Sequence, residues 1–241
     1  MSGLKLRRVK SGFARVHDES YFASAMKTSA PTSAFALLEL LVVLAVMFLL
    51  LVLMTPRYYK QGNAQLYACL SHQKQIGLGF ILFKDDNGGK FPWQLSATTN
   101  GTSELVNDGQ ASSEFKALEA YVKSYDVYVC PTDSGRTAPA SYATFTNRNT
   151  SYFVNVDAAT NNALLTGDRN LSADGRPVPP GQFAFNNSTA MNWTHELHPV
   201  KLFKDFGCLG FTDGRAQFVE GKELNAIFQG QVPSGSRLLV P

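Results

Sequence analysis

Four residues in the C-terminal half have side chains that could act together in chemistry: Asp168, His195, His198 and Asp213. Two imidazoles and two carboxylates could bind a transition metal or support acid–base hydrolysis. The spacing argues against this, because His195 and His198 are three residues apart, whereas zinc proteases place two histidines four apart on one helix face. We therefore expect both histidines at a loop surface, Asp168 in a loop where it bonds backbone amides, and Asp213 in a turn.

Other motifs of catalysis and ion binding are missing from the sequence. It has neither a Gly-rich phosphate loop nor a Gly-x-Ser-x-Gly elbow, so we predict that the chain is not an enzyme. Asp85, Asp86 and Asp133 could suggest calcium, but an EF-hand loop needs oxygen ligands at alternate positions and a distal Glu, which the Asp85-Asp86 run lacks. We expect this run to cap a helix, and we expect no cofactor and no metal.

The three cysteines are Cys69, Cys130 and Cys208. An odd number allows at most one internal disulfide and leaves one thiol over. If the domain lies in an oxidising compartment, we predict that Cys69 pairs with Cys130, which would join a helix to the domain that follows. The alternative is that all three are small buried hydrophobic side chains.

A long apolar stretch precedes all of these residues. From Phe35 to Met54 the only polar side chain is Glu39. Twenty helical residues at about 1.5 Å each cover roughly 30 Å, which is the thickness of a bilayer core. The stretch therefore predicts a transmembrane helix over residues 35–54, and a lone acid inside it indicates a function, because burying a charge in lipid is costly.

The charge distribution predicts how this helix is oriented. Residues 1–34 carry six basic and two acidic residues, whereas the rest carries 16 basic and 17 acidic residues. Cytoplasmic flanks are enriched in Lys and Arg, so we expect the N-terminus in the cytoplasm and the C-terminal domain outside. The near-neutral remainder has no basic surface of the kind that binds nucleic acid.

The segment Ala34-Phe35-Ala36-Leu37-Leu38-Glu39-Leu40-Leu41-Val42-Val43 resembles the prepilin cleavage and methylation motif of type IV pilins and type II secretion pseudopilins. The resemblance implies that a prepilin peptidase cuts between Ala34 and Phe35 and methylates the new amino terminus at Phe35. It also implies that Glu39 pairs with the terminal amine of a neighbouring subunit, and that Pro56 is the proline that often follows the span.

Further segments are similar to the major, G-type pseudopilin subgroup. They are residues 69–78, residues 85–92 and Val129-Cys130-Pro131-Thr132-Asp133. The resemblance covers about 80 residues, chiefly 33–93. It implies a pilin-like α+β fold, in which a long N-terminal transmembrane and stalk helix packs on a small, mostly antiparallel sheet.

The residue patterns add detail to this fold. We expect a leader over residues 1–34, the span at 35–54, an amphipathic stalk at 55–84 and a globular domain at 85–241 with a loose tail from Gln231 to Pro241. Apolar residues at helical spacing give the stalk its inner face. We also expect a helix at 113–122, a closing helical turn near Leu224, and a two-residue hairpin turn at Asp213-Gly214. The expected strands are 125–130, 151–156, 163–166, 182–185, 208–212 and 215–219.

The resemblance makes the chain a structural subunit of a type II secretion pseudopilus, held in the inner membrane with its domain in the periplasm. Its partners would be other pseudopilin subunits in a filament, a prepilin peptidase, an inner-membrane assembly platform and the lipid bilayer. Two alternatives are open. One is a minor pilin of a type IV pilus, and the other is a single-span membrane-anchored module that binds a ligand or metal.

Overall fold

The computed structural model describes residues 33–54, 61–198 and 206–241, and side chains are described from Ala36 to Leu53 and from Ala64 onward. The chain divides into two compact units between Pro56 and Arg57. The expected leader and Pro56 lie outside the described residues.

The first unit contains one helix, α1, over Ser33–Met54. Leu and Val dominate it and no Gly or Pro interrupts it, so the helix is continuous. Its large apolar side chains from Leu37 to Leu53 are 48 to 70 % exposed. The 18 residues Ala36–Leu53 are long and apolar enough to cross a membrane.

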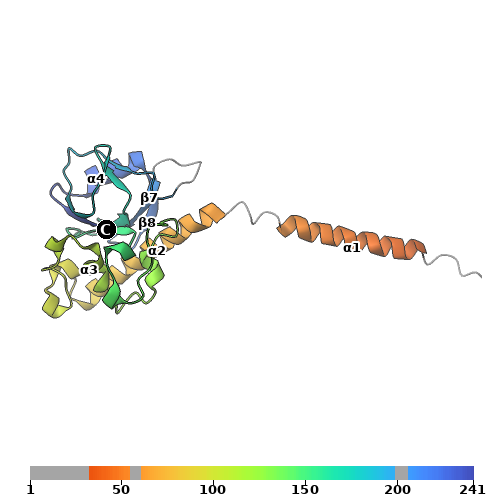
Figure 1. The fold of residues 1–241 in the computed structure, drawn as a ribbon, viewed down its shortest axis with the longest axis horizontal. Coiled ribbons are helices and arrows are strands. Elements are labelled where there is room, and N and C mark those ends of the chain that lie inside the picture. The colour runs from red at the N-terminus through yellow and green to blue at the C-terminus, as the bar shows by residue number, and fades with distance from the viewer. Residues whose placement is uncertain (1–32, 55–60, 199–205) are drawn as a thin grey trace, which may run out of the picture. The chain divides into compact units, whose positions relative to one another are not determined.

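The second unit begins with helix α2, over Gln61–Asp86 (Figure 1). The expected helical spacing is confirmed, because one face is buried against the sheet through Leu66, Cys69, Ile76, Phe80 and Phe83. Gly79 allows close packing, since a Cβ there would lie 2.6 Å from Val122 Cγ2. The helix ends at Asp86, within the run Asp85 to Gly89 expected to end it, and Gly88 and Gly89 have left-handed φ values of 65° and 81°.

The centre of this unit is a six-stranded antiparallel sheet in the order β5-β9-β1-β2-β7-β8. Its strands are β1 Tyr152–Asn155, β2 Leu164–Asp168, β5 Gly181–Ala184, β7 Phe206–Phe211, β8 Ala216–Glu220 and β9 Arg237–Val240. A second sheet has the order β4-β3-β6, formed by β3 Leu171–Ala173, β4 Arg176–Pro177 and β6 Met191–Trp193.

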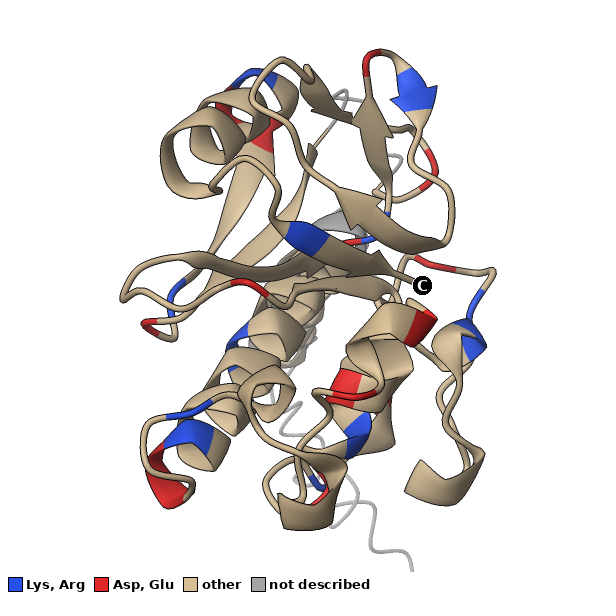
Figure 2. Ribbon diagram, turned by 90° about the vertical axis from the view of Figure 1, so that its left-hand side faces the viewer, with Lys and Arg blue, Asp and Glu red and all other residues tan. Residues whose placement is uncertain are grey.

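The large sheet is covered on both faces (Figure 2). Helix α2 and the short helix α3, Ala111–Lys116, lie on one side, and α4, Gly221–Gln231, lies on the other with the small sheet. Neighbouring strand residues point to opposite faces, so Tyr152 and Val154 enter the core under α2 while Phe153 enters the core under α4. Strands that contact a core on both sides read as continuous apolar runs.

Short 3₁₀ helices complete the side that carries α2 and α3. They are η2 Pro92–Gln94, η3 Ala97–Thr99, η4 Val106–Asp108, η5 Tyr125–Tyr128, η6 Tyr142–Thr144 and η7 Asn147–Asn149. Aromatic rings hold them together, with Tyr128 in contact with Phe115, Tyr142 and Phe145 at centroid distances of 5.1, 6.1 and 4.9 Å.

Several expected elements were wrong in detail. The strand predicted at 125–130 is η5, because its Val127 and Tyr128 fill the core without a strand edge to pair with. The helix predicted at 113–122 starts at Ala111 and ends at Lys116. The turn at Asp213-Gly214 joins β7 to β8 as predicted. The loop closed by the hydrogen-bonded residues Phe211 and Arg215 has three residues, however, and not two. Phe211 N donates to Arg215 O, and Gly214 has a φ of 81°.

The expectation of a loose tail was also wrong. Residues 237–240 form β9, which lies between β5 and β1 inside the large sheet. Leu238, Leu239 and Val240 are buried, so this strand contributes to both cores. Its pairing partners are 53 or more residues away in the sequence, and the turn residues Pro233 and Gly235 just before it favour a loop in any local pattern.

Candidate functional site

The structure brings together two of the four polar residues singled out from the sequence. Asp168 is the last residue of β2, and His198 lies in the segment that follows β6. His198 Nε2 is 2.8 Å from Asp168 Oδ2, and both side chains are fully buried. A buried carboxylate and imidazole at this distance form a charge-assisted hydrogen bond.

The central strands hold Asp168 in place. Asp168 is opposite Tyr152 of β1, and Cys208 of β7 donates its backbone N–H to Asp168 Oδ2 over 2.6 Å. The prediction that Asp168 bonds backbone amides is therefore correct, but the residue lies in a buried strand and not in a loop. Helix α2 covers this part of the sheet and brings its own side chains to the carboxylate.

Two cysteines complete the cluster. Cys69 of α2 places its Sγ 3.3 Å from Asp168 Oδ1 and 3.4 Å from the Tyr152 hydroxyl. Cys130, just beyond η5, places its Sγ 3.8 Å from His198 Nε2. The ligand atoms of Cys69, Cys130, Asp168 and His198 all lie within 4.8 Å of one another, and all four residues are buried.

The imidazole of His198 is held on both sides. Its Nδ1 is 3.1 Å from Thr132 Oγ1, while its Nε2 faces the carboxylate and Cys130. The ring stacks on Phe206 at a centroid distance of 5.2 Å. The backbone φ of His198 is 57°, a left-handed value that costs a non-glycine residue about 1 kcal/mol or more and persists where surrounding contacts impose it.

Burial and the close carboxylate set the protonation of these groups. Burial lowers the pKa of His198, but the hydrogen bond and charge of Asp168 outweigh it, and the pKa rises to about 10. Burial raises the pKa of Cys69 well above its usual value. The hydrogen bond to Cys69 and then burial raise the pKa of Cys130. At neutral pH the thiols of Cys69 and Cys130 are therefore neutral and the imidazole of His198 is protonated.

The predicted disulfide is not formed. Cys69, Cys130 and Cys208 are free thiols in the structure, and all three are buried. Cys69 and Cys130 are close in space, as the prediction required, but each sulfur also contacts polar groups other than the opposing thiol. The expected pairing missed these contacts because they come from β1, β2 and the segment after β6.

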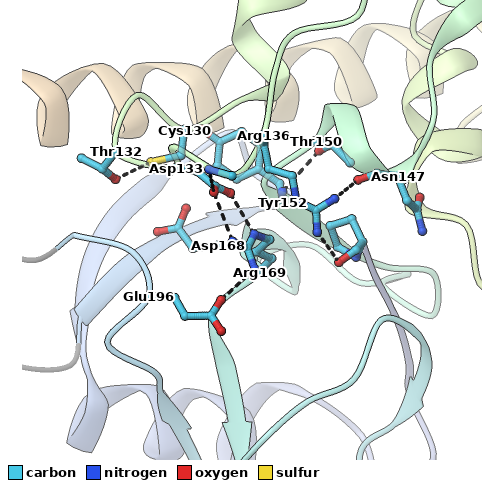
Figure 3. A network of polar contacts seen from close by, with 12 residues as sticks. Cys130, Thr132, Asp133, Arg136, Asn147, Thr150, Tyr152, Asp168, Arg169 and Glu196 are labelled. Carbon is cyan, nitrogen blue, oxygen red and sulfur yellow. Dashed lines mark hydrogen bonds and ion pairs between the residues drawn. The ribbon is translucent and has the colours of Figure 1, made fainter.

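An outer ion-pair network borders the cluster (Figure 3). Arg169, next to Asp168, contacts Asp133 at 2.8 Å and Glu196 at 2.8 Å. Burial raises the pKa of Asp133, but the bonds and charge of Arg169 outweigh this and hold the pKa below its usual value. The network fixes the segment of Cys130 to the end of β2, and it leaves Asp133 paired with a guanidinium.

The remaining candidates lie elsewhere. His195 is exposed, as predicted, whereas the prediction of an exposed His198 was wrong. Asp213 is in the β7–β8 turn, where it bonds the Arg215 amide and lies 3.7 Å from its guanidinium. Asp86 accepts a hydrogen bond from Tyr121. Among the described residues, the four-residue cluster is the one group of three or more His, Cys, Asp or Glu side chains close enough to share an ion.

The geometry of the cluster differs from that of a catalytic triad. In a triad, the nucleophile and the acid bind opposite nitrogens of the histidine ring. Here Cys130 and Asp168 both approach Nε2, and a hydroxyl occupies Nδ1. The four ligand atoms instead lie close enough together, and are buried, so that they could share one metal ion.

The processing and assembly residues belong to the first unit. Glu39 is exposed in α1, and within the described part of the chain it has no ion-pair partner. Ala34 and Phe35 lie in the first turn of α1, but their side chains are outside the described residues, as is Pro56. The chain matches no family model, no curated protein and no solved structure.

Proposed function

We propose that the chain is a structural subunit of a type II secretion pseudopilus, cut between Ala34 and Phe35 and assembled through its N-terminal helix. The observation that supports this most is α1 itself: an apolar helix of 22 residues whose one charged residue is Glu39. That acid stands four residues after Phe35, within a motif that resembles the prepilin cleavage and methylation site.

The physical argument starts from the cost of the Glu39 carboxylate. A carboxylate inside a membrane helix is costly, by about 2.5 to 3.5 kcal/mol at the helix centre and less toward its ends, so it normally has a partner. Helix α1 contains no Lys, Arg or His. Cleavage before Phe35 creates an α-amino group at the membrane, and the amine of a neighbouring subunit can then neutralise Glu39. A mismatched register would leave this charge unpaired, so the pair sets the axial register.

The second unit supports the same proposal. Helix α2 packs on an antiparallel sheet, so the exported domain would decorate a filament whose core is formed by packed copies of α1. Its partners would be other pseudopilin subunits, a prepilin peptidase and an inner-membrane assembly platform. The protein would cross the inner membrane once, with its second unit in the periplasm.

The decisive measurement is the intact mass and N-terminal sequence of the full chain extracted from the membranes of a producing cell that contains a prepilin peptidase. We expect a chain that begins at Phe35 and carries one extra methyl group. Ala34→Leu provides the matched control, because a bulky side chain before the cut should block processing while insertion continues. A wild-type chain that still begins at residue 1 or 2 contradicts the proposal.

Assembly is tested separately from cleavage. Glu39→Ala should insert and be processed, yet be strongly reduced in sheared or cross-linked filaments, because the register pair is lost. Leu38→Ala is the control in the same helix and should assemble close to wild-type levels. Normal filament formation by Glu39→Ala would refute the register role.

A further inference from the structure

The buried cluster of Cys69, Cys130, Asp168 and His198 has the spacing of a metal site. Zinc lies about 2.3 Å from sulfur and about 2.0 to 2.1 Å from nitrogen, so tetrahedral donors are about 3.3 to 3.8 Å apart. Cys69 Sγ and Asp168 Oδ1 are 3.3 Å apart, and Cys130 Sγ and His198 Nε2 are 3.8 Å apart. Since no pair of donors is more than 4.8 Å apart, closure around one ion needs shifts of about 1 Å.

The histidine ring is oriented for coordination. Its Nε2 faces both Cys130 Sγ and Asp168 Oδ2, whereas Nδ1 is 3.1 Å from the Thr132 hydroxyl. A histidine that binds a metal through one nitrogen normally donates the other ring N–H to a neighbouring acceptor, which fixes the tautomer. Thr132 is that acceptor, so the ring can place a lone pair on Nε2 at the centre of the cluster.

Each of the other three ligands already lies beside a hydroxyl or amide group that can donate a hydrogen bond to it. The Tyr152 hydroxyl lies 3.4 Å from Cys69 Sγ, and the Thr132 hydroxyl lies 3.0 Å from Cys130 Sγ. The Cys208 amide donates to Asp168 Oδ2 over 2.6 Å. These hydrogen bonds suit thiolates and a carboxylate, and such outer contacts strengthen metal binding.

The kind of ligand selects the metal. Two thiolates and one imidazole favour zinc over calcium or magnesium, which prefer oxygen ligands. The four protein ligands fill a tetrahedral shell and are buried, as in structural zinc sites. Cys208 lies beside Cys69 but is outside this group of four donor atoms.

We propose that Cys69, Cys130, Asp168 and His198 bind one Zn²⁺ that serves a structural role. The ion joins α2 to the segment after η5, to the end of β2 and to the segment after β6. Binding releases one proton from each thiol and one from the imidazolium, and no electrons are exchanged. The site does not depend on the filament role, because metal content can be measured whether or not the chain is cut before Phe35.

The first test measures zinc in the full chain, purified in mild detergent under reducing conditions through an affinity tag without histidines. We expect one zinc per chain by elemental analysis, with Cys69 and Cys130 free of any disulfide by mass spectrometry. Replacement with Co²⁺ should give the visible d–d bands of a tetrahedral ion and a sulfur-to-cobalt charge-transfer band. These spectra report thiolate ligation in the unaltered protein, so they do not depend on a variant that folds.

The second test compares variants with matched controls. His198→Ala should lose stoichiometric zinc, whereas His195→Ala, an exposed histidine three residues away, should keep one equivalent. Thr132→Val keeps all four ligands and should weaken zinc affinity by about 10- to 100-fold, because it removes the acceptor for Nδ1. Circular dichroism should show that Thr132→Val and His195→Ala retain wild-type secondary structure.

Three results would overturn the proposal. The first is a reduced wild-type chain that binds well under one equivalent of added Zn²⁺. The second is a Cys69–Cys130 disulfide in protein taken directly from the cell, because a disulfide cannot supply two thiolates. The third is equal loss of zinc in His195→Ala and His198→Ala, which would place the metal elsewhere.

Discussion

Glu39 in α1 and Asp168 in the second unit are both carboxylates in apolar surroundings, but the chain treats them differently. Asp168 is enclosed by His198, Cys69 and the Cys208 amide. Glu39 stands on helix α1, whose large apolar side chains from Leu37 to Leu53 are 48 to 70 % exposed. The second unit therefore surrounds the Asp168 carboxylate with its own polar groups, whereas α1 leaves Glu39 and its large apolar side chains exposed.

A third carboxylate lies between these cases. Glu114 of α3 is buried, and the Thr102 hydroxyl donates to its Oε2 over 2.6 Å. Its Oε1 has no hydrogen-bond partner among the described residues. Burial raises the pKa of Glu114 to about 8, against the weaker opposing effect of Thr102. A buried acid with a hydroxyl neighbour and no cation therefore stays protonated near neutral pH.

The largest expected change in unfolding free energy comes from removing the Asp168 carboxylate. In zinc-free protein, Asp168→Ala leaves the His198 imidazole and the Cys208 amide buried without their acceptor. Removing one partner of a buried pair costs about 3 to 5 kcal/mol of unfolding free energy. Urea unfolding in detergent with a chelator, followed by the fluorescence of buried Trp93 and Trp193, measures this change.

Asp213→Ala is the control for this change. Asp213 is exposed in a turn, and exposed ion pairs contribute about 1 kcal/mol or less. Equal losses of unfolding free energy in Asp168→Ala and Asp213→Ala would show that the buried contacts of Asp168 stabilise the fold no more than an exposed ion pair does.

A smaller effect is expected at Glu114, and it depends on pH. The folded pKa of about 8 exceeds the ordinary value of 4.5, so the native state keeps a proton that the unfolded state releases between these values. Stability should then fall as pH rises from about 4.5 to 8, by up to about 1.4 kcal/mol per pH unit. Glu114→Gln cannot ionise, so the difference in unfolding free energy between this variant and wild type should grow across that range.

Glu119→Gln removes a nearby exposed carboxylate and should leave the wild-type pH profile in place. If Glu114→Gln follows the wild-type profile throughout, then Glu114 ionises normally in the folded chain.

The smallest expected effect, that of Glu39→Gln, tests the contrast between Glu39 and Asp168. Glu39→Gln should change the unfolding free energy of the second unit by less than about 0.5 kcal/mol, because Glu39 lies in the first unit. The same urea titration measures it. A loss above about 1 kcal/mol would show that Glu39 is satisfied within its own chain, which contradicts the contrast with Asp168.

The features predicted best from the sequence are those that depend on residues close together in the chain. The apolar run of α1, the inner face of α2 and the β7–β8 hairpin at Asp213-Gly214 depend on local periodicity and turn residues. Strand β9 could not be found in this way, because its short run 237–240 is defined by strands that lie far away in the chain.

Only two of the four residues of the cluster were grouped together from the sequence, for the same reason. Asp168 and His198 were both singled out, but they were grouped with His195 and Asp213, which do not belong to the cluster. The real neighbours of Asp168 include Cys69, which is 99 residues away. Cys130 lies 68 residues before His198. A cysteine looks like a small hydrophobic residue in any local pattern, so only the packing of α2 on the sheet reveals its polar contacts.

The place of β9 bears on the order in which the protein can fold. β5 is attached to the large sheet through β9, and β1 has β9 as one of its two neighbours. A chain that emerges N-terminus first, from a ribosome or through a translocation channel, presents all the other strands before this one. Until residues 237–240 emerge, β5 cannot join the large sheet, and the edge of β1 that pairs with β9 has no partner. Synthesis that stops a few residues early would then leave an open sheet edge, which is a template for aggregation and a target for proteases.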